Sequence, residues 1–204
     1  MPNFFKNISF DLLSVNDNSF EVTPDFNLNE SSQDKKKILI PAAVLITIYN
    51  SPSGPTVIFT RRALGLKNHP GQISFPGGRV ERIDESELSA ALREAEEEIG
   101  LDSSKTTILG RLPSHETSTG FIVTPFICII EEISHLRPNL SEVREIFEVP
   151  LNFLLNKKNM NIHKLVINCK EKGYYAIPYG PYYIWGATAH IVKTFADWSQ
   201  IDVN

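Results

Sequence analysis

Two apolar stretches joined by a short turn constrain the fold more than any other feature of the sequence. The stretch "ILIPAAVLITIY" (38–49) is followed by "NSPSGP" and then by "TVIFTRR" (56–62). Serine, proline and glycine in the connection are typical of a tight turn, and the β-branched residues on either side favour strands. A strand with one face in water would alternate apolar and polar residues, whereas these stretches are almost wholly apolar. The sequence therefore predicts neighbouring strands that are buried on both faces, with helices covering the sheet.

Composition and charge exclude several classes of protein. A chain of 204 residues that is 42% hydrophobic can fill the core of one domain. Its net charge of −4 offers no broad basic field for nucleic acid. Cys128 and Cys169 lie in unrelated patterns, which indicates reduced thiols. The first apolar stretch is too short to span a membrane, so we expect a cytoplasmic protein that does not bind a membrane. We also expect a monomer or homodimer that does not bind nucleic acid.

The composition changes once along the chain. Residues 1–37 are rich in Asn, Ser and Asp and end in "DKKK", which predicts a short amphipathic helix at 4–13 followed by a polar connector. A single domain is expected over 38–204. Its further strands are predicted in "QISFPG", "TTILGRL", "FIVTPFICIIEE", "KLVINCK" and "YYAIPY". Helices are predicted in "SEVREIF", "LNFLLNK" and "GATAHIVKTFADWSQ".

A helix is predicted over 86–99, and its periodicity separates two stripes. At 100° per residue, four apolar side chains form a core-facing stripe: Leu88, Leu92, Ala95 and Ile99. Ala90 and Ala91 fall on the opposite, acidic side, where small side chains would leave room for a ligand. Asp84 with Glu87 three residues later resembles a capping box, and Gly100 suits the left-handed residue that ends a helix.

The second stripe consists of Glu94, Glu97 and Glu98, at helical-neighbour spacing. Like charges at this spacing cost about 0.2–0.5 kcal/mol per pair, and Arg93 offers local relief to Glu97. Most acidic runs are solvated faces, and the pattern alone leaves that interpretation open. The other interpretation is a divalent cation, because Mg²⁺ and Mn²⁺ prefer hard oxygen ligands. The glycine pair 77–78 just upstream could add a backbone carbonyl, since glycine lets the backbone approach an ion.

These residues together amount to a family resemblance. The segment "GGRVERIDESELSAALREAEEEIGL" (77–101) resembles the Nudix box, the signature of enzymes that cleave a nucleoside diphosphate linked to another group. Its second half matches throughout, in Arg93, Glu94, Ala95, Glu97, Glu98, Gly100 and Leu101. The first half departs from the general pattern, because Asp84 stands in place of Glu and the interval to Arg93 is one residue longer.

The longer, Asp-containing version is similar to the coenzyme A pyrophosphatase branch of the family. The upstream segment "IFTRRALGLKNHPGQISFPGG" (58–78) resembles that branch in Thr60, Arg62, Ala63, Gly71, Phe75, Pro76, Gly77 and Gly78. Lys67 stands where the motif usually has Arg, which keeps the charge but loses the bidentate fork. Downstream segments extend the resemblance to about Val192.

The resemblance implies an α/β fold in which a mixed β-sheet is sandwiched between helices (α/β/α). It also implies hydrolysis of the diphosphate of coenzyme A or its derivatives, with Mg²⁺ or Mn²⁺ as cofactor. The products would be 3′,5′-ADP and 4′-phosphopantetheine or its acyl derivative. Two alternatives remain: a Nudix pyrophosphatase for ADP-ribose, dinucleotides or oxidised nucleotides, and a Nudix-like binding module without catalysis. Such a module would be expected to lack one of the three box glutamates, and all three are present.

The resemblance also implies roles for individual residues. Glu94, Glu97 and Glu98 would hold the metal together with Gly78, and Arg93 would orient Glu97. Glu97 is the preferred general base, with Glu142 as a second candidate. The substrate would be bound by Arg62, Lys67, His69, Gly71, Phe75 and Gly77. His69 either contacts the substrate or braces the loop at Pro70. Tyr182, Tyr183 and Trp185 could stack on adenine, although "YYIW" is more typical of a core strand.

Overall fold

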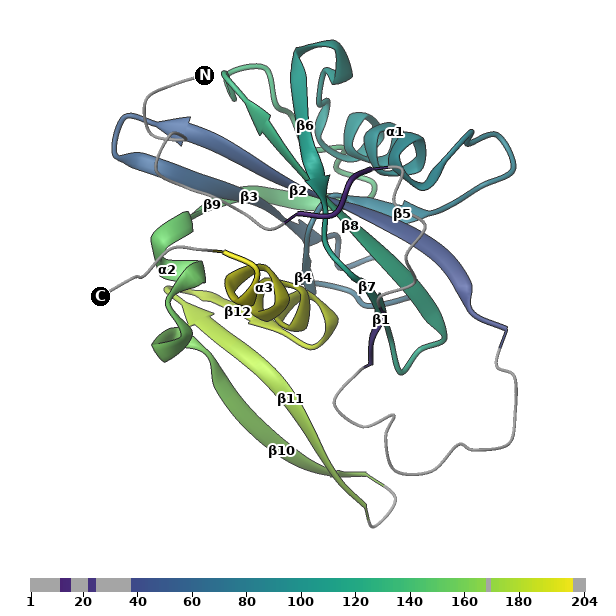
Figure 1. Cartoon of the computed structure of the whole chain (residues 1–204), viewed down its shortest axis with the longest axis vertical. Helices are drawn as coiled ribbons and strands as arrows, with labels where there is room; N and C mark the ends of the chain where they lie inside the picture. Colours follow the sequence, from purple (N-terminus) through teal and green to yellow (C-terminus); the bar gives the residue numbers. More distant parts are fainter. Residues whose placement is uncertain (1–11, 16–21, 25–37, 168–169, 200–204) are drawn as a thin grey trace.

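The computed structural model describes residues 12–15, 22–24, 38–167 and 170–199 (Figure 1). The strands are β1 (Val22–Pro24), β2 (Ile40–Ser51), β3 (Gly54–Arg62), β4 (Ile73–Ser74), β5 (Gly77–Arg79), β6 (Thr106–Arg111), β7 (Ser114–Glu116), β8 (Phe121–Ile130), β9 (Val143–Pro150), β10 (Asn161–Ile167), β11 (Lys170–Tyr179) and β12 (Tyr182–Trp185). The helices are α1 (Glu87–Ile99), α2 (Leu151–Leu155) and α3 (Ala187–Asp197), with 3-10 turns η3 (Ser103–Lys105) and η4 (Lys157–Asn159).

The described strands form two sheets. Nine belong to one sheet with the order β1-β7-β8-β2-β3-β4, in which β5 also pairs with β2, β6 with β8 and β9 with β3. The sheet is mixed, because β2 runs parallel to β8 but antiparallel to β3 and β5. The other three strands form a smaller sheet with the order β10-β11-β12. The two apolar stretches that dominate the sequence are thus β2 and β3, joined by the predicted turn.

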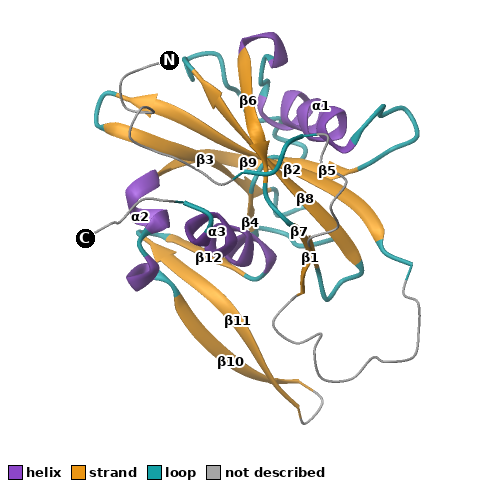
Figure 2. Cartoon of the chain, viewed as in Figure 1, coloured by secondary structure: helices purple, strands orange, loops and turns teal. Residues whose placement is uncertain are grey.

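Helices cover both faces of the main sheet, as the apolar strands predict. Alternate side chains of β2 enter different apolar clusters: Leu45 packs with Ala91 and Ala95 of α1, while Ile46 packs with Val192 of α3. Figures 1 and 2 show α1 on one side of the sheet and α2 and α3 on the other. The predicted α/β/α arrangement of a mixed sheet between helices is confirmed.

The N-terminal region is described only in part. The predicted helix at 4–13 falls largely outside the described residues, as does Cys169. Leu13 exchanges two backbone hydrogen bonds of 3.1 Å with Arg111 of β6. β1 lies within the predicted polar connector and pairs in parallel with β7. The connector therefore contributes a strand to the sheet, and the division of the chain at residue 37 stays a prediction.

The helix predicted in "SEVREIF" is wrong, because this segment forms most of β9. β9 pairs antiparallel with β3 along its length. Its side chains at 143, 147 and 149 are buried, whereas Arg144 between them is exposed. This two-residue alternation, with β-branched residues, suits a strand that must cover the open edge of β3. The predicted helices that correspond to α2 and α3 are confirmed.

Helix α1 is present where predicted, but its cap and its orientation differ from the prediction. Ser86 is the N-cap, and it exchanges hydrogen bonds with Ser89 in a capping box that the sequence had assigned to Asp84 and Glu87. Gly100 ends the helix in the left-handed conformation, with φ 68°, as predicted. The fully buried side chains are Ala90, Ala91, Ala95, Glu98 and Ile99, whereas Leu88 and Leu92 are half-buried. Small alanines let the helix lie close to the sheet, so the predicted space for a ligand beside them is filled by packing.

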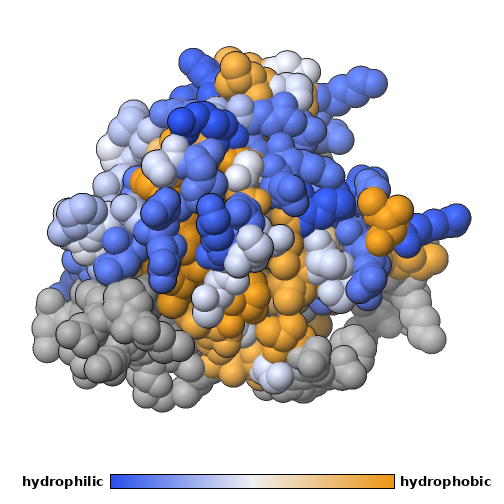
Figure 3. Space-filling model, turned by 90° about the horizontal axis from the view of Figure 1, so that it is seen from above, coloured by the Kyte–Doolittle hydropathy of each residue, from blue (hydrophilic) through white to orange (hydrophobic). Residues whose placement is uncertain are grey.

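The face of the molecule seen from above in Figure 3 is mostly hydrophilic, with an apolar band toward the lower edge of the view. Exposed glutamates of α1, Glu96 and Glu97, agree with a polar surface on this helix. Among the described helices, none is both long and apolar enough to span a membrane.

Candidate active site

The glycine turn and the acidic helix lie side by side. β5 pairs with β2, so that Gly78 lies opposite Ala43. A Cβ on Gly77 would come within 2.3 Å of the Ala43 carbonyl oxygen, and the φ of Gly77 is 146°. A Cβ on Gly78 would come within 2.6 Å of the Glu94 carboxylate. Backbone atoms therefore exclude a side chain at Gly77, whereas a Cβ on Gly78 would displace the Glu94 carboxylate. The glycine turn thus brings its backbone against a carboxylate of α1.

Glu98 is the most unusual side chain of this region, because its carboxylate is buried. The residue is 2% exposed and faces the junction between α1 and β5. Its Oε2 accepts a hydrogen bond of 3.3 Å from the Gly77 N–H, and its Oε1 lies 3.9 Å from Nη1 of Arg62. Burial raises the pKa of Glu98 to about 7, against the opposing effects of the Gly77 N–H and Arg62. A buried acid with so few donors is the kind of group found at functional sites.

Two further carboxylates adjoin Glu98. The side chain of Glu94 is 15% exposed, and its burial raises its pKa above the ordinary value while Arg93 opposes the rise. Glu142 lies in the turn before β9, and its charge contributes to the raised pKa of both Glu94 and Glu98. Glu97, by contrast, has a side chain that is 54% exposed. The site thus combines buried and solvent-facing acids.

Arg93 connects these acids. Its Nε and Nη2 donate to the two carboxylate oxygens of Asp84 at 2.9 and 3.0 Å. Its Nη1 donates to Glu94 at 2.9 Å and to Glu97 at 3.2 Å, and Nη2 also donates to the carbonyl of Arg79 at 3.2 Å. These five bonds match the five N–H donors of a guanidinium. They raise the pKa of Arg93 above its ordinary value, with the Asp84 hydrogen bond as the main cause, and hold Glu94 and Glu97 in place.

Asp84 is the residue whose part in the site the sequence did not reveal. It holds Arg93 rather than capping α1, and it also accepts a hydrogen bond of 2.8 Å from the N–H of Glu81. Both bonds lower its pKa, that with Arg93 more strongly. The only signal in the sequence was the departure from the general box at this position.

The cations and the loop residues of the upstream motif lie in different settings. Arg62, at the end of β3, faces Glu98, and its buried Nε has no hydrogen-bond partner among the described residues. Lys67 and His69 are exposed in the loop between β3 and β4, where His69 has a φ of 53° and Gly71 a φ of 71°. Phe75 is 2% exposed and stacks on a core phenylalanine with a centroid separation of 4.7 Å, so it packs beneath the site and presents no surface to a ligand.

The aromatic residues proposed for stacking are divided between two faces of β12. Tyr182 stacks on Phe147 at 3.7 Å, and its hydroxyl donates to Glu145 at 2.7 Å. Tyr183 and Trp185, on the other face, are 41% and 40% exposed. "YYIW" is therefore a strand whose alternate residues enter the core, and a stacking role for the exposed pair stays a prediction.

A metal ligand set can be drawn from the acids, although they are not gathered around one point. Within the described ranges, no group of three or more His, Cys, Asp or Glu side chains is close enough to hold one ion. The chemistry of the donors nevertheless fits a hard divalent cation. Glu94 and Glu98 are carboxylates kept from water with raised pKa values, and a nearby positive charge would favour their ionised form.

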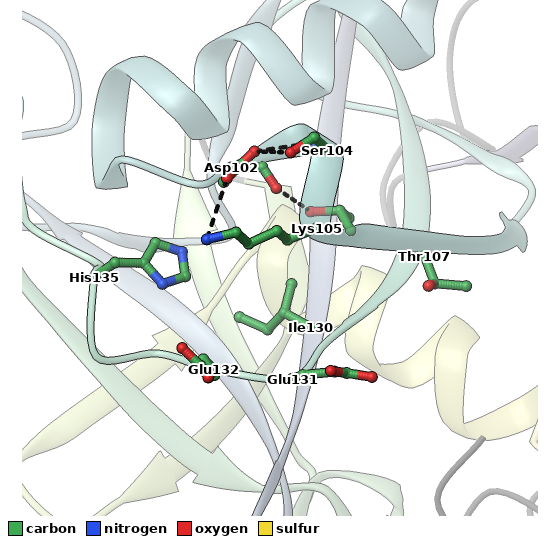
Figure 4. A pocket seen from close by; sticks show the side chains of 9 residues that line it. Asp102, Ser104, Lys105, Thr107, Ile130, Glu131, Glu132 and His135 are labelled. Carbon is green, nitrogen blue, oxygen red and sulfur yellow. Dashed lines mark hydrogen bonds and ion pairs between the residues drawn. The ribbon is translucent and has the colours of Figure 1, made fainter.

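A separate polar cavity of about 460 Å³ lies beyond the C-terminal end of α1. In Figure 4 the Lys105 side chain extends toward Asp102, and the two are 3.6 Å apart; His135 is drawn at the left of the view and Glu132 below it. The cavity contains none of the residues predicted for the site. Its polar side chains are exposed or half-buried, whereas the buried carboxylate of Glu98 adjoins both Arg62 and the glycine turn. The surroundings of Glu98 are therefore the candidate active site.

Known proteins show the family to which the chain is related. The model of the Nudix domain family matches residues 39–166. A protein of Photorhabdus laumondii named uncharacterized Nudix hydrolase NudL is 37% identical over 160 residues, covering 78% of this chain and 85% of that protein. Its namesake from Pectobacterium atrosepticum is 38% identical over 159 residues, covering 76% and 80%.

Solved structures were compared as well. The Nudix hydrolase RenU of M. smegmatis has a TM-score of 0.47 and 25% identity, covering 55% of this chain and 71% of that chain. A MutT/nudix family protein from Enterococcus faecalis has a TM-score of 0.49 and 13% identity, covering 82% and 64%. The matched range 39–166 is more than half of the chain and includes the glycine turn, Arg93 and the acids of α1. The chain therefore belongs to the Nudix family and is a Nudix hydrolase, an enzyme that acts on phosphorus-containing acid anhydrides.

Proposed function

We propose that this Nudix hydrolase cleaves the diphosphate of coenzyme A or its derivatives, giving 3′,5′-ADP and 4′-phosphopantetheine or its acyl derivative. One observation carries the proposal beyond the family. Arg62, from the upstream segment that resembles the coenzyme A pyrophosphatase branch, lies 3.9 Å from Glu98 of the box, and its buried Nε has no partner in the part of the chain that the structure describes. The two motifs thus adjoin one site, where this guanidinium has a donor to offer an anionic oxygen.

Members of the family generally use divalent metals such as Mg²⁺ or Mn²⁺. In this chain Glu94 and Glu98, with the backbone carbonyl of Gly78, would hold the ion, and Glu97 would complete the set. A bound ion of this kind polarises phosphoryl oxygens and promotes ionisation of an attacking water.

Other residues of the site are proposed to position the acids and to act as the general base. All five donors of Arg93 are engaged, so it positions Glu94 and Glu97 instead of binding phosphate. Glu97 is the general base that we favour, because its carboxylate faces solvent from which a water can be taken while Arg93 holds its direction. Glu142, in the turn beside Glu94 and Glu98, is the second candidate.

The cations ahead of the box are proposed to recognise the phosphates. Arg62 is directed toward the acids, whereas Lys67 is exposed on the preceding loop and can reach a ligand that extends outward. If one of them contacts the 3′-phosphate, dephospho-CoA should be the poorer substrate. A charge-assisted hydrogen bond is worth roughly 1.5–3 kcal/mol, which corresponds to about ten- to a hundredfold in kcat/KM.

Steady-state kinetics on CoA, dephospho-CoA and ADP-ribose, with products identified by mass, tests the proposal. Lys67→Ala should narrow the difference between CoA and dephospho-CoA if Lys67 makes the contact, and Arg62→Ala should do so if Arg62 does. Lys105→Ala is the matched control, because Lys105 is an exposed lysine outside the motif.

The outcome separates the candidate functions. Much faster hydrolysis of ADP-ribose than of CoA would replace the proposal by the alternative Nudix pyrophosphatase. Equal rates on CoA and dephospho-CoA would leave the proposed reaction standing but remove the role of the two cations.

A further inference from the structure

An apolar cavity of about 310 Å³ lies between the main sheet and the segment that follows β8. Its walls come from β3, from β9 and from the segment 133–138. The apolar residues that line it are Ile58, Ile133, Leu136, Pro138, Ile146 and Phe147. The cavity is on the α1 side of the sheet, because Ile58 and Leu136 belong to the apolar cluster that contains the buried residues of α1.

The cavity and the proposed diphosphate site share one face of β3. Side chains alternate along a strand, so Ile58 projects to the same side as Arg62, which reaches Glu98 on α1. Four residues at ~3.3 Å each separate the two by ~13 Å. Ile146 of the cavity lies opposite Thr60, midway between them.

The segment that roofs the cavity is fastened to the acidic end of α1. The Arg137 N–H donates to the carbonyl of Ile99 at 3.0 Å, and the Asn139 N–H donates to the carbonyl of Glu98 at 2.9 Å. The cavity therefore begins next to the turn that adjoins the buried acid.

The lining selects the kind of group that can enter. Glu148 is the charged residue among the lining residues, and its Oε2 already accepts a hydrogen bond of 2.6 Å from the Thr56 hydroxyl. A purine or a phosphate would give up its hydrogen bonds to water here, whereas an aliphatic chain loses none. The volume falls at the lower end of the ~300–1,000 Å³ found for small-molecule sites. An aliphatic group of modest length fits these limits.

We propose that this cavity receives the acyl group of an acyl-coenzyme A whose diphosphate is bound at Glu98. The inference rests on the proposed function and specifies its preferred substrate as the thioester. Each methylene group that leaves water for an apolar environment contributes about 0.8 kcal/mol, or roughly fourfold in kcat/KM. The preference over free CoA should therefore rise with chain length until the cavity is filled.

The test is kcat/KM of the full-length enzyme on CoA and on its acetyl, butyryl, hexanoyl and octanoyl thioesters. For each pair of carbons that the cavity buries, kcat/KM of the parent should rise by up to about fifteenfold, and the rise should end where the cavity is filled. Ile133→Trp, which places an indole in the cavity, should abolish this gain, measured as the ratio of octanoyl-CoA to CoA. Ile133→Ala, which removes part of the wall without adding bulk, should reduce it. Ile162→Trp is the matched control, because Ile162 is 56% exposed on β10 and outside the cavity; it should keep the ratio of the parent.

The ratio of kcat/KM for octanoyl-CoA to that for CoA does not depend on the fraction of folded enzyme. A variant that folds poorly can therefore still be compared with the parent. A flat chain-length series in the parent, or a rise that both Ile133 variants leave unchanged, would overturn the acyl site while CoA hydrolysis stands. Absence of hydrolysis of CoA and of every thioester by the metal-loaded parent would instead overturn the proposed function, and this inference with it.

Discussion

Glu98→Gln in the metal-free protein isolates the cost of the buried acid. Glu98 is 2% exposed, and burial raises its pKa from 4.5 to about 7. Because the folded state binds this proton more tightly than the unfolded state, the contribution to stability is fully present below pH 4.5 and is lost as the pH rises through about 7. At 1.36 kcal/mol per pH unit, the loss amounts to ~3 kcal/mol over the whole range.

Urea denaturation in EDTA at pH 5.5 and 8.5 measures this effect. Roughly three-fifths of the range from 4.5 to about 7 lies above pH 5.5, so the parent should lose ~2 kcal/mol of unfolding free energy relative to Glu98→Gln on going to pH 8.5. Comparison of the two proteins cancels the other titrating groups to first order. Glu96→Gln is the matched control, because Glu96 is an exposed glutamate of the same helix and should keep the pH dependence of the parent.

The same variant tests the metal assignment. Mg²⁺ or Mn²⁺ should restore stability to the parent at pH 8.5, since a ligand that binds only the folded state stabilises it by mass action. Glu98→Gln should lose most of this gain and most of its turnover. A parent whose stability in EDTA changes with pH as that of Glu98→Gln does would refute the reasoning about burial, and near-normal turnover in the variant would refute the metal role.

Two further substitutions test the residues that hold the acids in position, Gly78 beside Glu94 and Asp84 beside Arg93. Gly78→Ala should lower turnover by at least tenfold, because its Cβ would come within 2.6 Å of the Glu94 carboxylate; Gly65→Ala, where nothing lies within 4 Å, should have little effect in the same kinetic assay. Asp84→Asn should weaken metal activation by about 10–100-fold, as is typical when a partner of a ligand-orienting group is lost. Titration of activity with Mg²⁺ measures this, and unchanged activation would show that Arg93 holds Glu94 and Glu97 without Asp84.

The layered fold was predictable because its strands are apolar throughout. The stretches that became β2, β3 and β8 can only be buried on both faces, and this requires helices above and below. "SEVREIF" was misassigned because its charges suit a helix locally, while the open edge of β3 decides in favour of a strand. Secondary-structure propensity depends on neighbouring residues in the sequence, so it does not include the pairing of β9 with the distant strand β3.

The sequence located the acids of the candidate site on one helix, but it did not predict how deeply each of them is buried. The helical periodicity of α1 located its acids. It also predicted that Leu88 and Leu92 are buried together with Ala95 and Ile99, whereas both leucines are only half-buried. The small Ala91 and Ala95 let the helix turn toward its acidic side, which buries Glu98 and leaves Glu97 in solvent. Periodicity treats the three glutamates alike, so burial is what separates their chemistry.

The departure at Asp84 from the general box has a structural explanation. The Asp84 N–H donates to the Glu81 carbonyl at 3.1 Å, while its carboxylate accepts from the Glu81 N–H and from Nε and Nη2 of Arg93. A single short side chain thus closes the turn before α1 and fixes the guanidinium that holds two of the acids. With Asp84 committed to this turn, the cap of the helix falls two residues later, on Ser86. The helix thus has its own cap in Ser86, and the Asp84 carboxylate is left to bind Arg93.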